Sequence, residues 1–117
     1  MTIDYLTIFN SKPILDRIYL ASTLGRLRYG VKKNLRYIEP HWEDISEWLL
    51  ADALDNGWEK NGPLPISDTA FISRFESFLK ENKAEMEPFK INEEDLQHVD
   101  VISGEEENTI DWLLKSQ

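Results

Sequence analysis

Apolar residues recur every three or four positions over most of this chain, and that spacing restricts its fold more than any other feature. Such spacing places the apolar side chains on one face of an α-helix. The clearest example is residues 67–82, where Ser67 or Asp68 can cap a helix N-terminus. The apolar stripe that follows consists of Phe71, Ile72, Phe75, Phe78 and Leu79.

The same spacing predicts three earlier helices. The first spans about 13–24, because Asn10 or Ser11 can act as N-cap and Pro13 suits a first helical turn. The second spans 26–38. Pro40 is expected to end or kink it and to open a third helix over 40–55, which stops at Asn56 and Gly57. Residues 57–66 hold two glycines and two prolines, which predict an irregular linker.

The two ends of the chain are less regular. Residues 2–9 fit either a buried strand or a short helix, while 89–91 and 99–102 can form short strands flanking a helical turn at 93–97. Ser103 and Glu106 have the spacing of a capping box before a final helix. Two interpretations of 103–117 stay open: a helix packed on its own core, which we favour, or a semi-independent amphipathic peptide that docks into a partner.

Length and composition favour one folded domain over residues 1–117. The chain has 117 residues, 41% of them hydrophobic, so it can bury a core. We therefore expect a mainly α fold, a compact bundle of about four to five helices with a small β element from 2–9, 89–91 and 99–102. The lack of cysteine excludes disulfides and thiolate metal sites. With no apolar run long enough to span a membrane, we expect a cytoplasmic protein and no membrane partner.

Charge is segregated along the chain. Residues 11–38 carry a net charge of +6, whereas residues 39–117 carry −14; with Asp4 these give the total of −9. Fields of this kind favour charged macromolecular partners and raise their association rates.

The helix expected at 40–55 carries carboxylates at each turn, about 5–6 Å apart, a spacing comparable to that of nucleic-acid phosphates. Tryptophans beside such a row can anchor an interface. This pattern predicts a surface that binds a basic protein, either a nuclease toxin or a nucleic-acid-binding complex; the alternative is a solvated face that keeps the chain soluble. The predicted contact residues are Glu43, Asp44, Glu47, Asp52 and Asp55, with Trp48 and Trp58 as anchors.

A second interpretation concerns the basic segment. LASTLGRLRYGVKKNL, residues 20–35, resembles the helix-turn-helix pattern, which implies a DNA-binding regulator. The match departs at Arg26, Gly30 and Asn34. The alternative is two helices that pack in the core and turn their basic residues to solvent. The side chains that would contact DNA are Arg28, Lys32, Lys33 and Arg36.

Catalytic and metal chemistry find little support. His41 and His98 lie in no metal-ligand spacing, and no phosphate loop or nucleophile motif is present. We expect no enzyme, catalytic residue, metal or cofactor. In physical character the chain is similar to immunity proteins, antitoxins and phage anti-defence inhibitors such as anti-CRISPR proteins. Self-association is a third hypothesis, in which the basic block of one copy docks on the acidic half of another.

Overall fold

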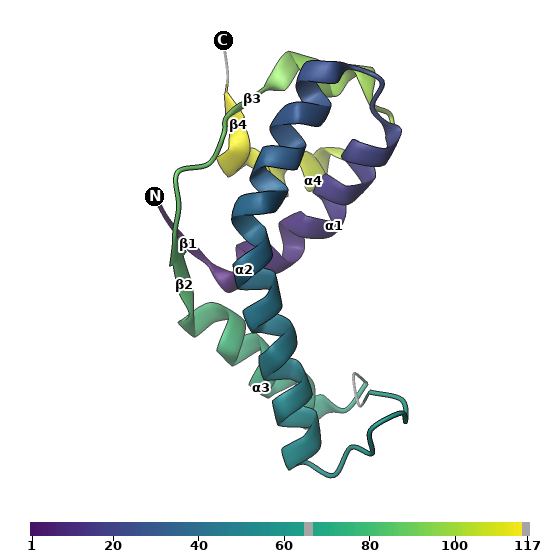
Figure 1. The fold of residues 1–117 in the computed structure, drawn as a ribbon, viewed down its shortest axis with the longest axis vertical. Coiled ribbons are helices and arrows are strands. Elements are labelled where there is room, and N and C mark those ends of the chain that lie inside the picture. Colours follow the sequence, from purple (N-terminus) through teal and green to yellow (C-terminus); the bar gives the residue numbers. More distant parts are fainter. Residues whose placement is uncertain (65–66, 116–117) are drawn as a thin grey trace.

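The computed structural model describes residues 1–64 and 67–115, and it confirms a mainly α fold (Figure 1). The longest helix, α2, runs along the long axis of a molecule measuring 49 × 27 × 23 Å, in front of the other elements in Figure 1. The described helices are α1 (Tyr5–Ala21), α2 (Gly25–Asp55), α3 (Thr69–Glu81) and α4 (Gly104–Thr109), with the 3-10 helices η1 (Glu93–His98) and η2 (Asp111–Leu113).

Within residues 1–64 and 67–115, four short strands form two small sheets. β1 (Thr2–Asp4) pairs antiparallel with β2 (Lys83–Glu85), with Thr2 opposite Glu85. β3 (Ile91–Asn92) pairs parallel with β4 (Leu114–Lys115). The strand predicted at 99–102 is wrong, since those residues are irregular, and the strand expected at 89–91 lies at 91–92. The helical turn expected at 93–97 is confirmed as η1.

Helix α1 begins eight residues before the predicted start at Pro13. Its N-cap is Asp4, whose carboxylate accepts hydrogen bonds from the Thr7 amide at 2.8 Å and the Thr7 hydroxyl at 2.7 Å. Residues 2–9 are therefore partly strand and partly helix. Pro13 lies inside the helix with its ring exposed, and the buried residues on either side, Ile8 and Ile14, hold the helix together across it.

Helix α2 is continuous over 31 residues, so the predicted division at Pro40 is wrong. Pro40 is exposed, while Ile38 and Ile45 on either side of it are buried on the same face. Packing of this face outweighs the local cost of an interior proline, which propensity alone puts at about 3 kcal/mol. The helix ends at Asp55, as predicted.

The core lies where α1 crosses α2, and the C-terminal segment closes it. Leu15 and Ile18 of α1 are fully buried, as are Leu27 and Val31 of α2. The predicted capping box of Ser103 and Glu106 is confirmed, but α4 is short and gives way to η2 and β4. Ile110 and Leu113 are fully buried, so the described part of 103–117 packs on the core; Ser116 and Gln117, like Pro65 and Ile66 of the predicted linker, lie outside the described residues.

Candidate functional site

One end of the molecule is an acidic arm, which we define as residues 40–64 and 67–81. It comprises the C-terminal half of α2, the following loop and α3, and it forms the lower end of the molecule in Figure 1. The arm carries nine acidic and three basic side chains, a net charge of −6. Helix α3 begins at Thr69 because Asp68 accepts a hydrogen bond from the Ala70 amide at 3.1 Å, as predicted.

The structure divides the predicted acidic row into two groups. The carboxylate of Asp52 accepts two hydrogen bonds from Arg74 of α3, both at 2.9 Å, and its side chain is only 12% exposed. Asp44 accepts a hydrogen bond from the Tyr5 hydroxyl at 2.8 Å. The remaining three, Glu43, Glu47 and Asp55, are exposed and have no ion pair among the described residues. Only these three are available to a partner without breaking an internal contact.

The two predicted tryptophan anchors make contacts within the fold. Trp48 stacks on Phe78 of α3 with ring centroids 4.6 Å apart, and on Phe75 at 5.7 Å. The Trp58 indole donates a hydrogen bond to the Gly62 carbonyl at 2.9 Å, which closes the loop after α2. Both rings are half-buried: Trp48 packs α3 against α2, and Trp58 holds the loop after α2. These contacts attach α3 and the loop after α2 to the C-terminal half of α2.

Sequence reasoning missed two exposed leucines on this arm. Leu50 and Leu54 are apolar residues of the helix predicted at 40–55, yet they are 44% and 54% exposed. Their spacing carried the signal, because seven residues separate Glu43 from Leu50 and also Glu47 from Leu54, which places all four on one helix face. The acidic row therefore continues into an exposed apolar pair.

The predicted DNA-contacting residues lie at the opposite half of α2. The Arg28 guanidinium and the Lys32 ammonium lie over the Tyr19 ring, 4.5 and 5.3 Å from its centroid. Hydrogen bonding and charge from Arg28 lower the pKa of Tyr19. Lys33 lies 5.1 Å from the Phe89 ring centroid, and Arg36 is exposed. The four basic groups thus lie along the first half of α2, with Arg28 and Lys32 beside α1 and Lys33 beside the segment between β2 and β3.

Two features of this region differ from the helix-turn-helix pattern. Leu20 and Ala21 open the matching segment, yet Leu20 is 80% exposed and Ala21 is also exposed, so neither packs one helix of the motif on the other. The turn is Ser22–Leu24, and Gly25 is the first residue of α2. The DNA-binding interpretation itself stays untested.

The departures at Gly30 and Asn34 have a structural reason. Asn34 is buried, and its side chain exchanges hydrogen bonds with the Phe89 backbone: its amide donates to the carbonyl at 2.7 Å, and its carbonyl accepts from the N–H at 2.9 Å. A Cβ at Gly30 would lie 3.2 Å from the Phe89 ring. Both residues let the segment between β2 and β3 lie directly on α2.

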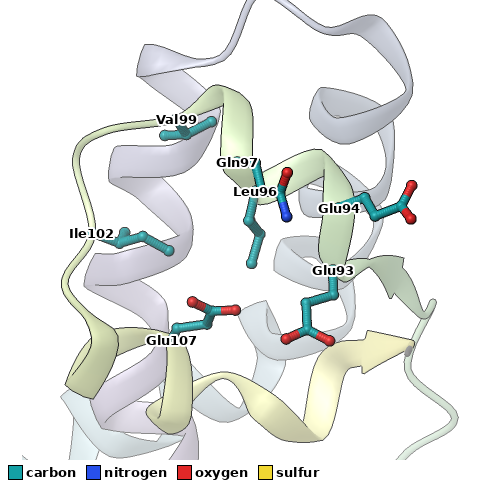
Figure 2. A pocket seen from close by; sticks show the side chains of 7 residues that line it. All are labelled: Glu93, Glu94, Leu96, Gln97, Val99, Ile102 and Glu107. Atoms are coloured by element: carbon teal, nitrogen blue, oxygen red, sulfur yellow. The ribbon is translucent and has the colours of Figure 1, made fainter. Parts of the chain in front are cut away.

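A cavity of about 370 Å³ lies between η1 and α4, outside every predicted site. Figure 2 shows Glu93 and Glu107 at the lower side of this cavity and Leu96 and Ile102 above them, while Glu94 points away. Within residues 1–64 and 67–115, no three histidine or carboxylate side chains are placed to hold a metal ion.

Tyr5, His41 and Asp44 form a small polar cluster. Besides its bond to Asp44, the Tyr5 hydroxyl lies 3.5 Å from His41 Nδ1. Burial first, and then the Asp44 carboxylate, raise the pKa of Tyr5 to about 12. A phenol with so high a pKa stays protonated at neutral pH, so it is suited to donating a hydrogen bond and not to acting as a base.

Comparisons of the chain with protein-family models, curated proteins and solved structures found no match. Among the described helices, none combines the length and hydrophobicity needed to cross a membrane. The geometry and charge of the surfaces above therefore carry the functional argument.

Proposed function

We propose that this protein binds and inhibits a basic macromolecular partner through the acidic arm. One observation carries the proposal: Leu50 and Leu54 are exposed on the helix face that also presents the free carboxylates of Glu43 and Glu47. Interfaces commonly combine an apolar centre with a charged rim. The apolar pair supplies the first, and the carboxylates supply the second.

Inhibition would occur by steric blockade of the partner. The carboxylates attract a basic surface over a distance set by the Debye length, about 8 Å at physiological salt, and so raise the association rate. The leucines then slow dissociation, because their apolar surface is removed from water when the complex forms. The Asp52–Arg74 pair fixes α3 on α2, so little ordering is needed on binding.

The proposed partner is a nuclease toxin or a nucleic-acid-binding defence complex in the cytoplasm. Such proteins carry basic surfaces that contact phosphates, and a row of carboxylates at helical spacing can occupy them. The class of function is that of immunity proteins, antitoxins and anti-defence inhibitors.

The test is neutralisation of the three free carboxylates. The triple variant Glu43→Gln, Glu47→Gln and Asp55→Asn removes three charges, and a matched control, Glu93→Gln, Glu94→Gln and Glu105→Gln, removes three elsewhere. A tagged protein is first used to recover basic partners from host lysate at about 0.15 M salt, and the recovered protein is then purified for binding and activity assays.

We expect the arm variant to weaken binding to the purified partner at least about tenfold and to flatten its salt dependence, with the control within about twofold of wild type. Replacing Leu50 and Leu54 with alanine should raise the dissociation rate. Equal binding by the arm variant and the control would contradict the proposal. Duplex DNA binding that is lost when Arg28, Lys32, Lys33 and Arg36 are neutralised would instead favour the helix-turn-helix interpretation.

A further inference from the structure

A continuous exposed face runs along most of α2 at alternating spacings of four and three residues. We call it the heptad face, because this spacing is the seven-residue repeat by which two helices pack along their length. All of its residues are exposed except Lys33, which is half-buried. Helix α2 lies in front of the other elements along its whole length in Figure 1. The heptad face consists of Tyr29, Lys33, Arg36, Pro40, Glu43, Glu47, Leu50 and Leu54.

The chemistry of this face is ordered along the helix. An aromatic residue begins it, basic residues follow, acidic residues come after Pro40, and two leucines end it. If a second copy of α2 lies antiparallel on this face, with the twofold axis between residues 41 and 42, apolar residues lie opposite apolar residues and basic residues lie opposite acidic ones or leucine. The apolar Tyr29, 57% exposed, meets Leu54 of the second copy. Arg36 meets Glu47 of the second copy, and the methylene stem of Lys33 covers Leu50.

Other arrangements of two copies lack this match. A parallel pair in register would set Arg36 against Arg36 and Glu47 against Glu47, and like charges in contact are unfavourable. Shifted by one heptad in one direction, an antiparallel pair would set Glu43 of each copy against Glu47 of the other. Shifted in the other direction, it would place Leu50 and Leu54 opposite Arg26 and Ser22, outside the heptad face. The twofold axis also makes every favourable contact occur twice.

We propose that the protein forms an antiparallel homodimer through the heptad face, with Arg36 of each copy paired to Glu47 of the other. This inference goes beyond the proposed function, because it concerns the purified chain alone. Each copy carries a net charge of −9, which opposes association. At physiological salt that repulsion is screened beyond about 8 Å, whereas direct Arg–Glu contacts within an interface are screened much less. Because the dimer would cover Glu47 and Leu54, a basic partner would compete with the second copy.

Charge exchange tests the register. Residues 36 and 47 of one chain lie eleven positions apart on α2, about 16.5 Å along its axis, so they cannot pair within a copy. Sedimentation velocity at about 0.15 M salt measures the dimer. We expect Arg36→Glu alone and Glu47→Arg alone each to weaken it at least about tenfold, since each creates two like-charge contacts. The double variant should return to within about threefold of wild type.

Two controls make the result decisive. Glu76→Arg makes the same change of charge on α3, outside the heptad face, and should strengthen or leave unchanged the dimer, since it reduces net repulsion. The chain has no cysteine, so disulfide trapping is clean. Arg36→Cys and Glu47→Cys proteins should cross-link when mixed under oxidising conditions, but neither should cross-link with itself, because identical positions lie about 16.5 Å apart along the axis.

Three results would overturn the inference: a monomer at every concentration up to about 1 mM, which corresponds to association weaker than about 4 kcal/mol; a dimer in which the double variant fails to recover; or cysteine variants that cross-link equally well alone. All three results concern the purified chain alone, so they leave the proposed function, which is measured as binding to a basic partner, intact.

Discussion

Replacing Asn34 with leucine should cost the protein a large part of its stability. The helix-turn-helix pattern expects an apolar residue here, so under that interpretation leucine should be tolerated or stabilising. In the structure the Asn34 side chain makes three hydrogen bonds, two with the Phe89 backbone at 2.7 and 2.9 Å and one to the Gly30 carbonyl at 3.0 Å. The two interpretations therefore predict opposite results from one substitution.

The magnitude follows from those bonds. Each is worth about 1 kcal/mol net, and a buried backbone group left without a partner costs about 1–3 kcal/mol. The two bonds to the Phe89 backbone are only partly buried, so the lower end of that range applies. The Gly30 carbonyl keeps its position in the helix ladder. We expect a loss of about 2–4 kcal/mol, which for a chain of this size lowers Tm by roughly 10 °C.

Urea denaturation followed by tryptophan fluorescence measures the free energy of unfolding, and Asn10→Leu serves as a control. Asn10 is exposed on α1, so its replacement should change stability by less than about 0.5 kcal/mol. Asn34→Asp keeps the acceptor for the Phe89 N–H but loses both donations, so it should also be destabilising. If Asn34→Leu were as stable as wild type, the attachment of the 83–92 segment to α2 described above would be wrong.

Two further predictions concern ionisable groups. The Arg26 guanidinium donates to both oxygens of Asp95, at 2.7–3.0 Å, and holds the pKa of that carboxyl below its usual range. The contribution of this ion pair to folding stability is therefore full above the unfolded-state pKa of about 3.9. It is lost as pH falls through the lower pKa of the folded state. The stability advantage of wild type over Asp95→Asn in denaturant melts should shrink below about pH 4, and an advantage constant down to pH 2 would exclude this pair as its source. The pKa of Tyr5 is raised to about 12, so alkaline absorbance titration should show one tyrosine that ionises at higher pH than the others and is absent in Tyr5→Phe. The stability that the protonated Tyr5 contributes is full below the ordinary pKa of about 10 and is lost as pH rises towards 12. Simultaneous titration of all the tyrosines in the folded protein would contradict that environment.

Helix caps and helix ends, which depend on a few neighbouring side chains, were predicted well from the sequence. The cap at Asp68, the end of α2 at Asp55 and the capping box of Ser103 and Glu106 all lie where the sequence places them. Each depends on a few neighbouring residues, and the same side-chain and backbone groups meet whatever the rest of the fold does. Residues 93–97 also form a helical turn, as predicted.

Residue order alone accounts for the mainly α class, the periodic faces and the separation of charge. The remaining features depend on which elements pack together in three dimensions. Helix α2 continues past Pro40 because Ile38 and Ile45 are buried, and Asp52 pairs with Arg74, 22 residues away. Leu50 and Leu54 stay exposed. Burial and long-range pairing depend on which elements meet, and periodicity shows that a helix has an apolar face without showing whether a neighbour covers it.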